Sequence, residues 1–117
     1  MLTPLDPAEF AAICGRIDAG TADRADLKAA TKHLLALLQR KAPGHSVEVR
    51  IPPFAAIQCI EGASHTRGTP PAVVETDAET WIALARGRLE WEGAPVRASG
   101  ERSDLSPLLP LVADPAG

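Results

Sequence analysis

Aromatic side chains are scarce in this chain of 117 residues, which contains two Phe, two Trp and no Tyr. Much of its 45% hydrophobic content is alanine, so the larger apolar residues suffice for one modest core and not for two. Charged residues make up 23%, a value typical of globular proteins, and this excludes disorder of the whole chain. We therefore expect a single domain over residues 1–117, with residues 113–117 as a flexible tail.

The chain also lacks an excess of positive charge and a long apolar run. Its net charge is -3, which disfavours a nucleic-acid partner. No apolar segment approaches the roughly 20 residues that span a bilayer, and residues 1–6 lack the basic and apolar regions of a signal peptide. These absences predict a cytoplasmic protein without a transmembrane segment. The oligomeric state is left open.

Cysteine and histidine are too few and too scattered to predict a metal site. Cys14 and Cys59 form no CxxC motif, and the three histidines form no HxH or HExxH motif, so no metal, cofactor or enzymatic activity is expected. A thiol-dependent enzyme with Cys59 as nucleophile and His65 as base is a distant alternative. It is disfavoured because Cys59 lies in an apolar segment, where burial raises the thiol pKa.

Residues 6–42 are predicted to form a pair of helices. Apolar residues recur with helical spacing from Phe10 to Ile17, after a start in which Asp6 and Glu9 resemble a capping box. Asp23 is the predicted cap of the second helix, which ends before Pro43. His33 lies among polar positions of this second helix and is predicted to be on the surface.

Residues 45–112 are predicted to contain the sheet. Residues 47–51 alternate between apolar and charged, as a half-buried strand does, whereas residues 54–61 are apolar on both faces, as a central strand would be. These two strands are expected to pair antiparallel. Further strands are predicted at 72–75 and 96–100, a helix capped by Thr76 and Glu79 between them, and one or two apolar helical turns after residue 105. The fold class is thus α+β, with helices mainly over one face of the sheet.

Two polar features stand out against this background. Arg67 and His65 lie in the longest loop, where Arg67 can hold the carboxylate or phosphate headgroup of a ligand, or can pair with Glu61 or Glu75 and tie down the loop. Gln58 interrupts the apolar segment, and a buried amide needs hydrogen-bond partners. It either bonds a neighbouring loop or helix end, or faces a cavity that contains water or ligand.

The segment VEVRIPPFAAIQCIEGASHTRGTPPAVV (residues 47–74) resembles the bacterial branch of the sterol carrier protein type two family. The blocks IPPFAAIQCIEG and HTRGTPP are its specific part, and Trp81, the stretch 84–89 and the stretch 96–105 continue the resemblance, which covers roughly residues 5 to 111. A similar domain forms the C-terminal part of mycothiol-dependent maleylpyruvate isomerases.

The resemblance implies a curved, mostly antiparallel sheet of about five strands, with an apolar cavity for a lipid between the sheet and the helices. By analogy, the candidate cavity walls are Phe54, Ile57, Ile60, Val73, Trp81, Leu84, Trp91, Leu105, Leu108 and Leu109. The connection at residues 89–96 is shorter than is usual in the family and predicts either an open groove or a filled core.

The function expected from the resemblance is non-enzymatic binding or carrying of a hydrophobic small molecule such as a sterol, a fatty acyl chain or another lipid. The alternative is a protein-interaction module that docks an enzyme through an apolar face. A pocket of about 300 Å³ or more lined by these residues favours lipid binding. A contiguous exposed apolar patch above about 400 Å² favours the interaction module.

Overall fold

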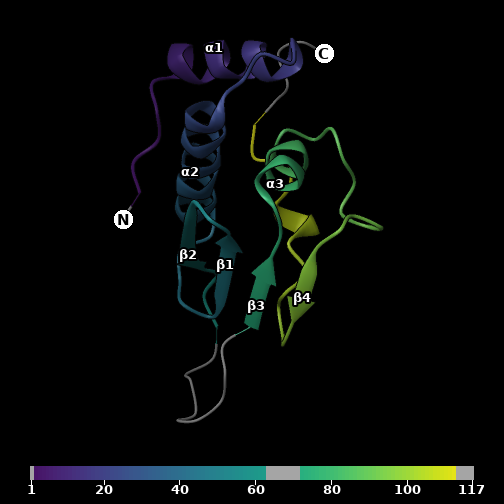
Figure 1. Ribbon diagram of the computed structural model, residues 1–117. Coiled ribbons are helices and arrows are strands. Elements are labelled where there is room, and N and C mark those ends of the chain that lie inside the picture. Colours follow the sequence, from purple (N-terminus) through teal and green to yellow (C-terminus); the bar gives the residue numbers. More distant parts are fainter. Residues whose placement is uncertain (1, 63–71, 113–117) are drawn as a thin grey trace.

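The computed structural model of the chain describes residues 2–62 and 72–112 (Figure 1). The predicted order of helices and strands is confirmed, except that the C-terminal apolar segment forms one 3₁₀ turn, Ser106–Leu108, instead of an α-helix. The other elements are α1 (Pro7–Asp18), α2 (Arg24–Lys41), β1 (Val47–Ile51), β2 (Ala55–Cys59), β3 (Ala72–Glu75), α3 (Ala78–Ala85) and β4 (Arg97–Ser99). The chain is thus a mixed α+β structure.

The sheet has four strands in the order β2-β1-β3-β4. β1 pairs antiparallel with β2, as predicted, and β3 pairs antiparallel with β4, but β1 and β3 are parallel. The expectation of about five mostly antiparallel strands is therefore corrected to an open mixed sheet of four. The parallel pair arises because β2, antiparallel to β1, ends beside the start of β1, and β3 also begins there, so that β3 runs in the direction of β1.

One face of the sheet is buried against the helices. Val47, Val49 and Ile51 alternate along β1 and have no solvent exposure, and Leu34 and Leu38 of α2 are equally buried in the same hydrophobic cluster. The opposite face carries half-buried and exposed polar side chains, among them Glu48, Arg50, Gln58, Glu75 and Arg97. The alternation of apolar and polar residues in the sequence is the direct cause of this one-sided core.

β2 is an edge strand and not the central strand that its apolar sequence predicted. Its burial alternates along the strand: Ile57 and Cys59 are buried, whereas Ala56 and Gln58 are exposed. The prediction of a buried Gln58 is therefore wrong, and a Gln58→Leu substitution leaves no buried partner unpaired. Small alanine side chains made an exposed face look apolar, and this misled the sequence interpretation.

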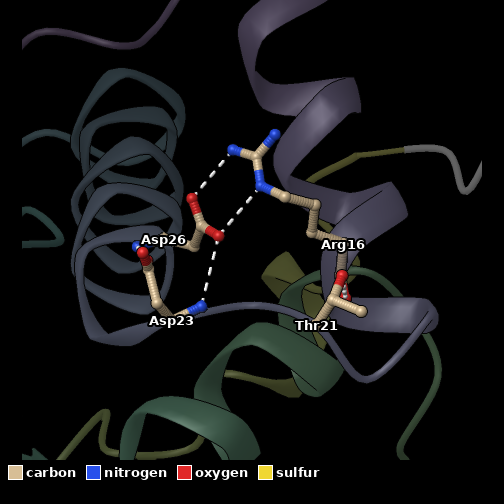
Figure 2. A network of polar contacts seen from close by, with 4 residues as sticks. All are labelled: Arg16, Thr21, Asp23 and Asp26. Atoms are coloured by element: carbon tan, nitrogen blue, oxygen red, sulfur yellow. Dashed lines mark hydrogen bonds and ion pairs between the residues drawn. The ribbon is translucent and has the colours of Figure 1, made fainter.

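The helix ends also differ in part from the predictions. Asp23 caps α2 as predicted and forms a reciprocal capping box with Asp26, and Arg16 of α1 bonds Asp26 across the helix pair (Figure 2). Asp6 makes no side-chain cap of α1. The cap of α3 is Asp77, whose carboxylate accepts from the Thr80 backbone N–H at 2.8 Å, and Thr76 is not the cap.

His33 is buried, contrary to the surface position predicted from its polar neighbours. Its exposed fraction is 6%, its ring stacks on Phe10 of α1 at 4.1 Å between centroids, and its Nδ1 atom accepts a hydrogen bond from the Leu5 backbone N–H at 2.9 Å. Burial lowers the pKa of His33, so its neutral form is favoured. His33 thus joins the N-terminal segment to α2.

The turn between α2 and β1 requires glycine at position 44. Gly44 has φ +148°, and a Cβ atom built there would lie 2.2 Å from the backbone carbonyl carbon of Ile60. The Ile60 N–H donates to the Ala42 carbonyl at 2.7 Å, so the end of β2 is held directly against this turn. The close approach brings the C-terminal end of α2 beside the outer edge of the sheet.

Candidate functional site

The predicted cavity walls are largely packed into the core. Trp81 and Leu84 are each 1% exposed and Leu105 is fully buried, while Ile57 is 6% exposed. The remaining predicted apolar walls are half-buried: Phe54, Ile60, Val73, Trp91, Leu108 and Leu109. The indole Nε1 of Trp81 donates to the Thr31 carbonyl at 3.3 Å, which fixes the ring against α2. Their role as ligand walls stays a prediction.

The predicted headgroup residues His65 and Arg67 lie outside the described residues. At the near end of their loop, Arg102 donates from Nη1 to the Glu61 carbonyl oxygen at 2.7 Å. The two alternatives for Arg67, ligand binding and loop anchoring, therefore both stay predictions.

A pocket of about 400 Å³ lies among the three helices. Its larger apolar lining residues are Ile17 of α1, Leu27 of α2 and Ile82 of α3, and Ala83 of α3 also lines it. Its other lining residues are Asp18, Gly20, Ala22, Glu79, Arg86 and Arg88. α1 lies across the α2 and α3 ends in Figure 1, so that residues far apart in sequence meet at this place. We call it the helix pocket.

An ion pair between a buried arginine and a partly exposed aspartate lines the helix pocket. Arg86, only 4% exposed, donates from Nη1 and Nη2 to the two carboxylate oxygens of Asp18, each at 3.0 Å. Arg88 adds a second guanidinium, which donates to Asp18 Oδ1 at 2.9 Å. The hydrogen bond to Asp18 is the main cause that raises the pKa of Arg86, so this arginine stays charged despite burial.

Sequence reasoning missed this pair. Along the sequence, the carboxylates that follow Arg86 and Arg88 most closely are those of Glu90 and Glu92. Their partner is 68 residues away from Arg86 at the end of α1. The available signal was an arginine at the end of a strongly apolar helix, where a cation is favoured by the helix dipole and a burial partner is needed.

A second pocket, of about 490 Å³, lies beside β2 at the C-terminal end of α2. We call it the edge pocket; its lining residues are Leu2, Gln39, Pro43, Gly44, His45, Ala56, Ile57 and Gln58. His45 Nδ1 and Gln58 Oε1 are 2.8 Å apart, and Gln39 donates from Nε2 to the Gln58 carbonyl oxygen at 3.3 Å. Gln58 thus lines a pocket beside the outer edge of the sheet. A position facing a cavity was one of the two alternatives predicted for this residue.

The thiols are buried, as predicted. Cys59 has no exposed surface, and burial raises its pKa to about 11, whereas a nucleophilic cysteine needs a lowered pKa. Cys14 is also buried. In the part of the chain that the structure describes, no group of three or more His, Cys, Asp or Glu residues is placed to hold a metal ion.

A family model described as bacterial SCP ortholog matches residues 23–111, about three quarters of the chain. The chain belongs to this bacterial sterol carrier protein family. The match includes α2, the sheet and α3 and leaves out α1, so the sterol carrier family segment supplies only part of the wall of the helix pocket. No curated protein matches the chain. Among the described residues, the helices are too short or too polar to cross a bilayer.

Proposed function

We propose that the protein binds and carries a hydrophobic small molecule without catalysing a reaction, and that the helix pocket is the binding place. The observation that carries the proposal is a pocket of about 400 Å³, partly lined by apolar side chains, in a member of the sterol carrier family. Small-molecule sites usually have about 300–1,000 Å³ and combine apolar walls with a few polar groups. Here the polar groups are the Asp18 carboxylate and the guanidinium groups of Arg86 and Arg88.

The pocket suits an elongated apolar molecule with one polar end. Ile17, Leu27 and Ile82 offer apolar surface to a hydrocarbon part. The polar end would lie at the side where Asp18 and Arg88 are partly exposed, since burying it among the apolar side chains would cost its hydration. A fatty acyl chain and a sterol both have this division into apolar body and polar end.

The pocket is continuous with the core through Ile82, which lines it and belongs to the same hydrophobic cluster as Trp81. A ligand larger than the pocket would have to displace core side chains, and the walls expected from the family resemblance would then take part. Trp81 therefore serves as a reporter next to the pocket. The protein has no Tyr, so its intrinsic fluorescence comes from Trp81 and Trp91 alone.

The test is a titration of the full chain with dodecanoate and, separately, with a soluble sterol analogue, followed by tryptophan fluorescence. Trp81→Ala is unsuitable as a variant, because removing a fully packed indole would cost about 3–5 kcal/mol of stability. Ala83→Phe instead fills the pocket from a half-buried position on α3 and removes no side-chain contact. Ala25→Phe, at an exposed position of α2 outside the pocket, is the matched control.

A saturable shift of the emission is expected with at least one of the two ligands. Ala83→Phe should weaken this binding at least tenfold, while Ala25→Phe should leave it within twofold, with both variants folded by circular dichroism. Absence of any response across both ligands would overturn lipid binding. Equal binding by Ala83→Phe and the unchanged chain would overturn the helix pocket as its place.

The interaction-module alternative has less support from the described surface. Among the described residues, Leu89 is the one large hydrophobic side chain that is exposed, at 39%. A single exposed leucine is ordinary for a globular protein and forms no contiguous apolar patch.

A further inference from the structure

The edge pocket faces the backbone of β2. Its lining includes three consecutive strand residues, Ala56, Ile57 and Gln58. Consecutive side chains in a strand point to opposite faces of the sheet, so a pocket that touches all three must lie beside the strand. β1 occupies one side of β2, and the edge pocket therefore lies on the other, outer side.

The hydrogen bonds of the sheet indicate which backbone groups of β2 point into this pocket. Arg50 of β1 accepts from the Thr76 N–H at 3.2 Å, so its backbone groups face the β3 side, and those of its neighbour Val49 face β2. Val49 is opposite Ile57, whose N–H and C=O therefore point to β1. The backbone groups of Ala56 and Gln58 point outward, in agreement with the bond from Gln39 to the Gln58 carbonyl.

The side-chain amide of Gln39 in α2 already takes the position of one peptide group at this edge. Its Nε2 atom donates to the Gln58 carbonyl oxygen, as the N–H of an added strand would. Its Oε1 atom is buried and has no hydrogen-bond partner in the described structure. Buried polar atoms are nearly always paired in native proteins, so this carbonyl oxygen is an acceptor that an incoming N–H group would satisfy after a rotation of the Gln39 side chain exposes it.

The two edges of the sheet differ in their protection against added strands. β4 has only three residues, carries Arg97 and follows Pro95, which are features that oppose strand addition. β2 has five residues, AAIQC, without charge or proline. None of the residues that line the edge pocket is Lys, Arg, Asp or Glu. Apart from the bond from Gln39 to the Gln58 carbonyl, this edge is uncharged and free of proline, and such an edge is suited to a strand from another molecule.

We propose that the edge pocket binds a short, extended and uncharged peptide segment of a partner protein as an added strand beside β2. The segment would exchange hydrogen bonds with the outward N–H and C=O of Ala56, and an N–H group of the peptide or a neighbouring polar side chain would bond Gln39 Oε1. An apolar side chain of the peptide would lie against Leu2 and Ile57, which line the same pocket.

The shape of the edge pocket favours a single peptide segment over a second copy of this chain. The pocket is bounded by Leu2 on one side and by Gln39 and Pro43 at the end of α2 on another. If a second copy paired through its β2, the C-terminal end of its α2 and its Leu2 would have to occupy the same narrow space. A free extended segment of four or five residues, about 3.3 Å each, carries no such obstruction.

The experiment uses the ¹⁵N-labelled full chain and the probe peptide acetyl-Ser-Val-Thr-Val-Ser-amide, with two N-methylated versions of it. One version is methylated on both Val nitrogens, the other on the Thr and the last Ser nitrogen. An added strand donates to its neighbour through the N–H of every second residue, so one version loses every bond that it donates to β2 and the other loses none. Gln39→Leu and the matched exposed control Arg40→Leu complete the set.

The unmodified peptide should shift the amide signals of Ala56 and Gln58 and slow the hydrogen exchange of the Ala56 N–H at least tenfold, leaving Ala98 of β4 unchanged. One N-methylated version should bind within threefold of the parent and the other at least tenfold more weakly. Gln39→Leu should weaken binding at least fivefold and Arg40→Leu less than twofold. The proposal would be overturned if saturating peptide caused no shifts, or if both methylated versions bound equally. It would also be overturned if the same amides shifted with protein concentration in the absence of peptide, because the edge would then bind a second copy.

Discussion

The ion pair between Asp18 and Arg86 joins the ends of α1 and α3, and the substitution Asp18→Asn tests how much it stabilises the fold. Asparagine keeps the shape of the side chain and one accepting oxygen but removes the charge. The guanidinium of Arg86 is 4% exposed and makes two hydrogen bonds of 3.0 Å to Asp18, so its charge would lose its main hydrogen-bonded counterion while it stays buried. We therefore expect a loss of stability rather than a neutral exchange.

The size of this loss of stability depends on how deeply the Asp18 and Arg86 side chains are buried. Removing one partner of a fully buried ion pair costs about 3–5 kcal/mol. Because the Asp18 side chain is 33% exposed, water screens part of the interaction, and we expect about 2–3 kcal/mol. The contact between Asp18 and Arg88 adds little, since both side chains are about one-third exposed. With a urea m-value of about 1–3 kcal/mol/M, the midpoint should fall by roughly 0.7–3 M.

The control is Arg16→Gln in the network of Figure 2. Arg16 also makes two hydrogen bonds to one carboxylate, from Nε and Nη2 to Asp26 at 2.9 and 2.8 Å, but its side chain is 47% exposed. Its substitution should move the urea midpoint much less than Asp18→Asn. If Asp18→Asn shifts the midpoint by less than about 0.3 M, or if the two variants lose the same stability, then burial does not decide the strength of these pairs and the reasoning is refuted.

Three further predictions concern single residues. Because burial lowers the folded-state pKa of His33, stability should be constant above about pH 6.5 and should fall as the pH decreases below that value. The fall should be at most about 1.4 kcal/mol per pH unit and should end once the folded-state pKa is passed. In urea titrations, His33→Gln should remove this slope between pH 7 and 5.5. Cys59, with a pKa of about 11, should react with an aromatic disulfide reagent at pH 7 more than about 100-fold more slowly than a free thiol, and rapid labelling would revive the enzyme alternative. Gly44→Ala should destabilise by at least about 2 kcal/mol in thermal or chemical denaturation, because its Cβ would meet the Ile60 carbonyl, and an unchanged midpoint would contradict that contact.

Local patterns in the sequence predicted the elements well because each depends on neighbouring residues. The change from helical spacing to alternation near residue 45 marks the real border between α2 and β1. The Asp23 cap was predicted correctly because an aspartate directly before a run of helical spacing is a local signal. The cap of α3 was placed one residue too early, on Thr76, because several of its neighbours can serve as caps. Thr76 instead donates from its hydroxyl to the Pro95 carbonyl at 2.9 Å, a contact no local pattern contains.

Features that depend on distant contacts were not predictable in the same way. Whether β2 is central or at an edge depends on where β3 pairs, and composition alone suggested the centre. The burial of His33 depends on Phe10 and Leu5, which reach it only once α1 and the N-terminal segment are in place. For the same reason the candidate site differs from the predicted one, because Asp18 and Arg86 are 68 residues apart and meet only where the ends of α1 and α3 come together.

The two proposed sites can be tested separately because α2 holds them apart. Leu27 lines the helix pocket and Gln39 lines the edge pocket, and the 12 helical steps from one residue to the other span about 18 Å. Between these positions Leu34, Leu35 and Leu38 are fully buried, so this part of α2 is fixed by packing against the core. A ligand in one pocket therefore has no mobile element through which to change the other. Saturating the edge pocket with peptide should leave the dissociation constant for dodecanoate within twofold, and a larger change would show that α2 moves as a unit between the two sites.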